Sequence, residues 1–226
     1  MSNVIIGGTP YEGVNVVKIP LEGNTSEYAE FTNRENAILD GTFSGDFENN
    51  QVTKIRSRAL EGMTGITAVK MANVTDVEYY AFSGCTSMKT LEMPKLKNIG
   101  NASFINCKAL VEVFLPSAEA VNAIMAFQGC DALKKVDLAG PKSTGGWQIN
   151  ANAFEGCDVL DTFIIRSSLA VVSLNNANAF ANTPIANGTG YVYVPKSILS
   201  QYTENTSWET YKNQLRAIED YPDICG

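Results

Sequence analysis

Apolar and polar positions recur in a fixed order along most of the chain. Each unit begins with an apolar anchor after a small residue, passes through a short turn, and ends in a stretch where apolar and polar residues alternate. The anchors are Leu60, Phe82, Phe104, Phe127, Phe154 and Phe180. Successive anchors lie 22, 22, 23, 27 and 26 residues apart. One unit of this length cannot bury its apolar side chains alone, so neighbouring units must stack into a continuous core.

The alternating stretch predicts one short, half-buried strand in every unit. Its inward positions hold apolar pairs: Leu91/Met93, Val113/Leu115, Val136/Leu138 and Phe163/Ile165. Another apolar position precedes each anchor and predicts a second short extended segment on a different side of the coil. A period of about 20–29 residues with such strands is typical of a leucine-rich-repeat solenoid. We therefore predict a right-handed β/α-type superhelix of about six repeats, with short strands, short helical or 3-10 turns, and stacked anchors.

The segments on either side of the repeat divide the chain into three predicted parts. Residues 49–195 form the solenoid. Residues 1–48 lie outside the repeat and are expected to cap the first open edge of the coil, which solenoids need for solubility. A docking arm for a larger assembly is the alternative role for residues 1–48. Residues 196–226 are expected to form a helical cap at the other end.

The helical cap is predicted from a change of period after residue 195. Trp208, Tyr211, Leu215 and Ile218 recur at helical spacing, which predicts an amphipathic helix of about three turns. Its apolar side is expected to cover the last repeat. A helix that binds a partner is the alternative interpretation.

The repeated segment resembles the BspA-like leucine-rich repeats of bacterial proteins. The hallmark of these repeats is Ala-Phe-x-x-Cys, followed by a strand that ends in proline, as in Ala81–Pro94. Residues 50–195 fit this pattern, with four nearly complete copies in register. The end of the chain, from Tyr191 to Pro222, also resembles the close of such proteins in gut bacteria and their prophages. The resemblance implies a scaffold for binding or adhesion, and it supplies no catalytic residues.

Composition and charge narrow the classes of partner. With 226 residues, 45% of them hydrophobic and 18% charged, the chain suits one elongated domain with caps. A net charge of −7 disfavours nucleic acid or an anionic membrane as partner. No apolar run is long enough to span a bilayer. Met1–Gly8 lacks the basic start of a signal peptide, so a cytoplasmic, released or particle-associated protein is expected. A cell-surface location stays open if a leader has been removed.

Four of the five cysteines occupy the same position in successive repeats: Cys85, Cys107, Cys130 and Cys157. Free cysteine behaves as a small, frequently buried hydrophobe, so we expect reduced thiols in the core, with disulfides between neighbours as the alternative. Cys225 is expected to be exposed in the tail. The chain contains no histidine and no Cys-x-x-Cys, so neither a zinc site nor another cofactor is expected.

Catalytic chemistry has no recognisable residues in this sequence. Histidine, the commonest general base, is absent. A nucleophilic cysteine or serine needs a neighbouring base, and no motif places one. The carboxylates are scattered, and the glycine pairs read as turns rather than a phosphate-binding loop. We therefore predict that the chain is not an enzyme.

The remaining candidate for function is the outward face of the predicted sheet. One row of outward residues across neighbouring strands would read Lys70, Glu92, Phe114, Asp137, Ile164 and Tyr193. Large apolar side chains on a solvent-facing sheet indicate an interaction patch. The candidate binding residues are therefore Phe114, Ile164, Glu92, Asp137, Tyr191 and Tyr193. A cap that covers these residues, the tyrosines in particular, is the alternative.

The function predicted from this face is noncatalytic binding of a protein or glycan, in adhesion or recognition. A structural or accessory component of a phage particle, encoded by a prophage, is the alternative.

Overall fold

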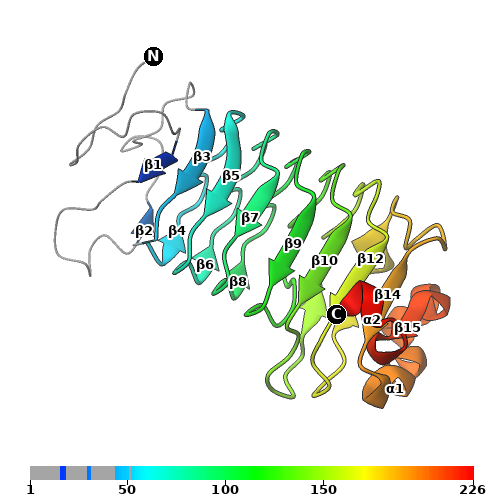
Figure 1. The fold of residues 1–226 in the computed structure, drawn as a ribbon. Helices are drawn as coiled ribbons and strands as arrows, with labels where there is room; N and C mark the ends of the chain where they lie inside the picture. Colours follow the sequence, from blue (N-terminus) through cyan, green and yellow to red (C-terminus); the bar gives the residue numbers. More distant parts are fainter. Residues whose placement is uncertain (1–15, 19–29, 32–43, 51) are drawn as a thin grey trace.

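The described chain is an elongated coil whose turns stack side by side, as Figure 1 shows. The computed structural model describes residues 16–18, 30–31, 44–50 and 52–226. Each turn contributes a strand to one long face, and consecutive strands run parallel. The predicted solenoid is confirmed.

The long face consists of two parallel sheets placed end to end. The first sheet contains, in spatial order, β1 (Val16–Lys18), β3 (Gly45–Glu48), β5 (Ile66–Lys70) and β7 (Thr90–Glu92). The second sheet contains β9 (Glu112–Leu115), β10 (Lys135–Leu138), β12 (Thr162–Ile165), β14 (Tyr191–Val194) and β15 (Leu215–Ala217). Figure 1 shows β9 beside β7, so the face continues across the boundary between the sheets. We call this surface the sheet face.

A second side of the coil carries shorter strands, as the apolar positions before each anchor predict. One set contains β2 (Glu30–Phe31), β4 (Lys54–Ile55), β6 (Asp76–Val77) and β8 (Asn98–Ile99). The other contains β11 (Gln148–Ile149) and β13 (Ser173–Leu174). Ile55, Val77 and Ile149 are buried, which ties this side to the common core.

The anchors form the expected ladder through that core. The rings of Phe82, Phe104, Phe127, Phe154 and Phe180 stack in succession with centroid separations of 5.3, 5.0, 5.5 and 5.6 Å and interplanar angles of 10° or less. All five rings are fully buried. Each separation is close to the spacing of adjacent strands, about 4.8 Å, because each ring belongs to one coil and the coils stack at the strand spacing.

The turn after each anchor explains why glycine recurs there. Gly84 adopts φ +72°, and Gly62, Gly129 and Gly156 adopt +69°, +67° and +69°. This left-handed conformation is costly for most residues but open to glycine, with asparagine the next most tolerant. Asn106 and Asn182 occupy the equivalent positions at φ +58° and +59°. The two repeats that lack the glycine therefore carry the substitute that the backbone accepts most readily.

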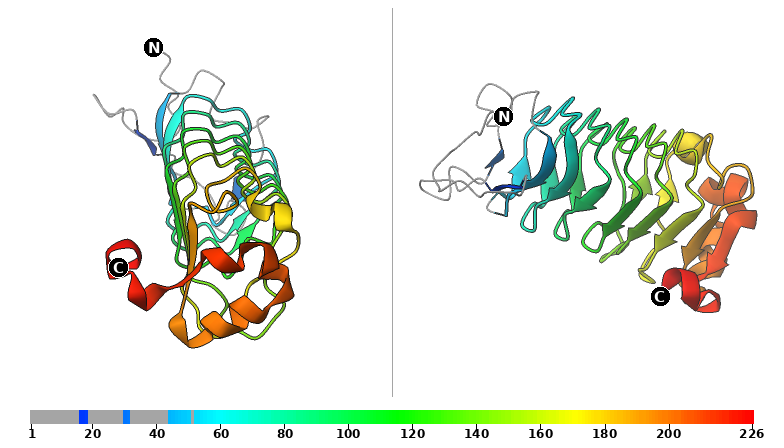
Figure 2. Two further views of the ribbon diagram at one scale, coloured as in Figure 1. Left: turned by 90° about the vertical axis from the view of Figure 1, so that its right-hand side faces the viewer. Right: turned by 45° about the horizontal axis from the view of Figure 1, so that its top comes forward.

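The C-terminal end of the coil is closed by short helices, which Figure 2 shows end on. They are η3 (Lys196–Ile198), α1 (Leu199–Glu204), η4 (Thr206–Gln214), η5 (Ile218–Asp220) and α2 (Pro222–Cys225). A further short helix, η2 (Ala177–Phe180), belongs to the last repeat and carries its anchor. Trp208 and Tyr211 of η4 pack on Phe180, the last ring of the ladder. Trp208 is fully buried and donates from Nε1 to the carbonyl oxygen of Val172 at 2.8 Å.

The predicted three-turn helix is wrong beyond Gln214. Leu215 lies in β15 and is paired with Val192, so the chain adds one more strand to the sheet. Alternate burial of Leu215 and Ala217 follows the period of a strand. Leu215 and Ile218 are three residues apart, as on a helix, but Leu215 and Ala217 are two residues apart, as on a strand. The spacing of apolar residues therefore does not distinguish a helix from a strand here.

The parallel sheet begins earlier than residue 49. Phe47 of β3 is fully buried in the core, and β3 pairs with β1. The strand repeat therefore includes part of the segment expected to be a cap. Most of residues 1–48 lies outside the described residues, so its capping or docking role stays a prediction.

Candidate binding surface on the sheet face

The predicted row of outward residues lies on the sheet face, in register within each of its two sheets. Phe114 is opposite Asp137, Asp137 is opposite Ile164, and Ile164 is opposite Tyr193 in the registers of β9, β10, β12 and β14. Lys70 is likewise opposite Glu92 in the first sheet. The six candidate residues therefore belong to one face, although their exposure differs widely.

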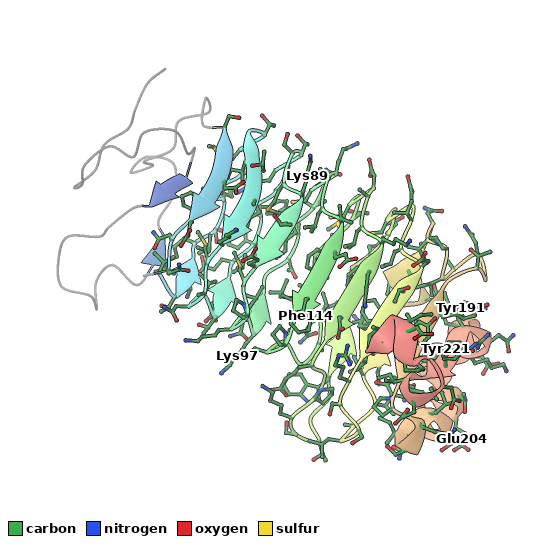
Figure 3. All side chains as sticks on the ribbon, in the orientation of Figure 1. Lys89, Lys97, Phe114, Tyr191, Glu204 and Tyr221 are labelled. Atoms are coloured by element: carbon green, nitrogen blue, oxygen red, sulfur yellow. The ribbon has the colours of Figure 1, made fainter. Side chains whose placement is uncertain are left out.

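Phe114 is the exposed member of this row. Its side chain is 58% exposed, and among strand residues with described side chains it is the one large apolar residue left open to solvent. Figure 3 labels it near the middle of the sheet face. An open hollow of about 650 Å³ lies beside it. The hollow is lined by Glu112, Phe114, Lys135, Asp137, Arg166 and Gly226, among others.

Asp137, which also lines the hollow, forms an ion pair. Its side chain is 7% exposed, and its carboxylate accepts two hydrogen bonds from Arg166, Nε to Oδ1 at 2.8 Å and Nη2 to Oδ2 at 2.7 Å. These bonds raise the pKa of the Arg166 guanidinium above its ordinary value. Both carboxylate oxygens of Asp137 thus accept a bond from Arg166, and this two-pronged pair fixes the guanidinium at the wall of the hollow.

Ile164 and Tyr193 point outward but are not exposed. Ile164 is 0% and Tyr193 2% exposed, because residues Ile218–Gly226 fold back over them. Cys225 completes this small cluster and is 2% exposed, so its predicted exposure is wrong. We call Ile218–Gly226 the tail. The expectation of an open Ile164 is wrong because the tail covers the end of the sheet face.

The other candidates fall between these extremes. Tyr191 is partly buried, and the Arg216 guanidinium lies 4.3 Å from its ring centroid. Glu92 is exposed, with its carboxylate 3.7 Å from the Lys70 ammonium, and neighbouring opposite charges on a sheet are mildly favourable. Phe114 and Glu92 are thus the candidates that solvent reaches freely, whereas Asp137, Ile164 and Tyr193 are buried.

The family of the chain follows from its repeats. The profile described as "BspA type Leucine rich repeat region" matches residues 44–144 and 126–221 with six copies. The chain belongs to the BspA-type leucine-rich-repeat family. No curated protein matches it closely enough to count as a relative.

Three solved structures are similar to this BspA-type chain. The pneumococcal vaccine antigen PcpA shares 12% identity over 74% of this chain, with a TM-score of 0.48. The leucine-rich-repeat protein of T. pallidum shares 19% identity over 79% of this chain and 84% of its own, with a TM-score of 0.41. A leucine-rich cell surface protein of Faecalibacterium prausnitzii shares 14% identity over 92% of this chain and 88% of its own, with a TM-score of 0.24. The chain spans 40% of the length of PcpA.

The cysteine column of the BspA-type repeats lies in the core, as predicted. The Cys85 and Cys107 thiols donate to the carbonyl oxygens of Leu60 and Phe82 at 3.2 Å, and the two later repeats copy this bond. All five cysteines are free thiols. Burial raises the pKa of Cys85 to about 12, and the pKa values of Cys130 and Cys157 lie well above the ordinary value of a thiol. Cys85, Cys130 and Cys157 therefore stay protonated. All four thiols of the column fill space in the core.

An ionic cluster on the other side of the coil was not anticipated. Glu78 accepts hydrogen bonds from the Ser57 hydroxyl at 2.8 Å and the Ser57 backbone N–H at 3.0 Å, with Lys54 and Arg56 at its other oxygen. Burial alone would raise the pKa of Glu78, but these donors outweigh burial and lower the pKa to about 2. The four residues come from neighbouring repeats, and only the 22-residue offset could have indicated that they meet.

Two further features concern the described ranges, 16–18, 30–31, 44–50 and 52–226. In them, no three His, Cys, Asp or Glu residues gather in a way that could hold a metal ion. None of the helices in these ranges has the length and apolar character needed to cross a bilayer.

Proposed function

We propose that the chain is a noncatalytic recognition module that binds a protein or glycan through its sheet face. Phe114 is the anchor, and Glu92 and Glu112 flank it on the open part of the face. The hollow between Phe114 and Arg166 receives the ligand. This role suits a BspA-type scaffold for binding or adhesion.

The exposure of Phe114 is the observation that carries the proposal. A phenylalanine 58% exposed on a regular strand has no role in the core of its own repeat. Burial of such a side chain against a ligand contributes about 1.5–3 kcal/mol. The adjacent hollow adds Lys135, Arg166 and Glu112 as polar groups that can orient a ligand. An apolar anchor beside a few polar groups is the usual composition of a recognition site.

The chemistry of the face supports binding without catalysis. The Asp137 carboxylate is held by two bonds from Arg166, so it is not free to act as a general base. Burial raises the pKa of the Cys225 thiol above its ordinary value, although the charges of Arg166 and Lys135 oppose that shift. A protonated thiol is a poor nucleophile.

A binding experiment with matched variants tests the proposal. The purified chain is applied to an array of immobilised glycans and to a panel of immobilised extracellular-matrix proteins and mucins. Phe114→Ser should weaken binding to any positive probe roughly tenfold or more, since an apolar anchor is lost. Leu169→Ser is the matched control, because Leu169 is 60% exposed but lies in the loop after β12.

The result that contradicts the proposal is equally specific. If Phe114→Ser and Leu169→Ser bind a positive probe as tightly as the unaltered chain, the sheet face is not the recognition surface. Thermal unfolding of both variants must coincide with that of the unaltered chain, because each residue is largely exposed.

The place of the protein in its host is a separate question that fractionation answers. An antibody against the chain would be used to quantify it in cytosol, envelope, medium and phage particles purified after prophage induction. Enrichment on the envelope or in the medium agrees with adhesion or recognition. Enrichment in particles would instead favour the alternative role as a phage component.

A further inference from the structure

The tail crosses the sheet face from strand to strand. It leaves β15 at Ile218, places the Tyr221 ring 5.4 Å from Tyr193 of β14, and packs Cys225 with Ile164 of β12. The carbonyl oxygen of Ile224 then accepts a hydrogen bond from Nζ of Lys135 on β10 at 2.9 Å. Figure 2 shows α2 outside the coil, on the side of these strands. The tail therefore passes over three successive strands in order.

The path of the tail leads to the hollow beside Phe114. Gly226 lines that hollow together with Glu112 and Phe114 of β9. Asp137 on β10 stands opposite Ile164, which the tail covers, and opposite Phe114, which is open. A polypeptide that follows the route of the tail one strand further would reach Phe114.

The contacts beneath the tail form a second apolar cluster, separate from the core. Ile164, Tyr193 and Cys225 are its buried members, with Tyr191 and Ile218 packed at its margin. The core inside the coil holds all the anchors and the four column cysteines. A segment held by so few buried contacts can open without unfolding the rest of the protein.

The charges of the tail complement the surface that it covers. The tail contains Glu219, Asp220 and Asp223. Lys196 pairs with Asp220 at 2.9 Å, and its backbone N–H donates to Glu219 at 2.8 Å. Lys135 stands near Cys225 on the sheet side, and so does Arg166, whose charge is compensated by Asp137. The face under the tail therefore suits an acidic segment that presents an aromatic and a small apolar side chain.

We propose that the tail is a displaceable cover, and that an acidic peptide segment of a partner protein takes its place on the sheet face. The partner segment follows the path of the tail, fills the position of Cys225 between Ile164 and Tyr193, and extends to Phe114. This inference rests on the proposed recognition role and names a protein segment as the ligand. In the unbound protein, the tail covers this part of the sheet face.

Cys225 reports whether the cover opens. Among the five cysteines it is the one held by the tail, whereas the other four lie in the core. Alkylation with iodoacetamide, followed by mass spectrometry of peptides, measures each thiol separately. Under native conditions Cys225 should be alkylated well before the four column thiols. Cys225→Ser should abolish the fast phase and leave the slow one.

A peptide added in trans tests whether the uncovered face binds. The probe is a synthetic peptide with the sequence of residues 217–226 and serine in place of Cys225. If it occupies the face when the tail opens, it holds the tail away and raises the alkylation rate of Cys225. At a peptide concentration about ten times its Kd for the uncovered face, the alkylation rate of Cys225 should rise roughly tenfold. A scrambled peptide of the same composition should leave the rate unchanged.

Three outcomes overturn the proposal. In the first, Cys225 reacts only together with the core thiols, which means that the tail does not open separately. In the second, the peptide leaves the rate unchanged. In the third, the rate rises with protein concentration in parallel with a dimer, which makes a second copy the occupant. None of these measurements uses the panel of glycans and matrix proteins, so failure here is distinct from failure of the recognition role.

Discussion

Arg166 and Asp137 form a two-pronged ion pair across the neighbouring strands β12 and β10. The Asp137 side chain is 7% exposed, whereas the Arg166 side chain, just past the end of β12, is 38% exposed. The pair thus holds one buried and one partly solvated charge. Its geometry fixes a wall of the hollow, and the buried carboxylate depends on the guanidinium for compensation.

Replacement of Arg166 should therefore destabilise the protein. Arg166→Met leaves the Asp137 carboxylate buried without its cation, and we expect the free energy of unfolding to fall by about 2–3 kcal/mol, less than for a fully buried pair because Arg166 is partly screened. Urea unfolding measures the change. The double variant Arg166→Met with Asp137→Asn should recover part of the loss. Equal stability of the single and double variants would contradict this account.

The ring ladder makes a second prediction. Phe127→Ala removes a fully buried ring that stacks on Phe104 at 5.0 Å and on Phe154 at 5.5 Å. Such a truncation costs about 3–5 kcal/mol, because apolar burial is lost and a cavity remains. Urea unfolding should show this loss, and Phe127→Leu should lose clearly less. A loss below about 1 kcal/mol for the alanine variant would mean that the ladder is not continuous.

The fold could be predicted from the sequence because its information is local and repeated. Each unit carries the same order of anchor, turn and alternating strand. The fold of one such unit alone would be ambiguous, but six units in register indicate a solenoid. The stacking of Phe82 on Phe104 follows directly from the 22-residue period. The outward row, including Phe114 opposite Asp137, follows from the strand period of two.

The cover over the sheet face could not be predicted in the same way. The tail lies outside the repeat, and its route depends on β15, which turns the chain back towards Ile164. Leu215 and Ile218 have a spacing that fits a helix, yet Leu215 lies in a strand. Pairing with β14 outweighs this local preference, because the edge of β14 would otherwise be left open. Burial of Cys225 is a consequence of that pairing.

The left-handed turn column offers a test in which no packing changes. Gly84 adopts φ +72°, and a Cβ added there would meet nothing closer than 3.8 Å. Gly84→Ala should lower the free energy of unfolding by about 1–2 kcal/mol through backbone strain alone. Gly84→Asn should cost less, as Asn106 implies. Gly146→Ala is the control, since a Cβ there meets open space and no such φ applies, and it should be neutral or slightly stabilising.

The donors around Glu78 link the stability of the coil to pH. The pKa of Glu78 in the folded protein is about 2, below the ordinary value of 4.5. Between these values the unfolded chain takes up a proton while the folded protein keeps the carboxylate charged. The stabilisation by Glu78 is therefore complete above pH 4.5 and is lost as the pH falls towards 2.

Glu78→Gln should remove this dependence. Because Glu78 is 26% exposed, we expect a loss of only about 1–2 kcal/mol near neutral pH. The difference between the variant and the unaltered chain should shrink as the pH approaches 2, where the unaltered chain loses the same charge. Urea unfolding across this range measures both effects. Glu92→Gln, in a pair with Lys70 at 3.7 Å on the open face, should change stability by less than about 1 kcal/mol at neutral pH. A constant difference between Glu78→Gln and the unaltered chain across the range would show that the donors act on Glu78 by packing rather than through its charge.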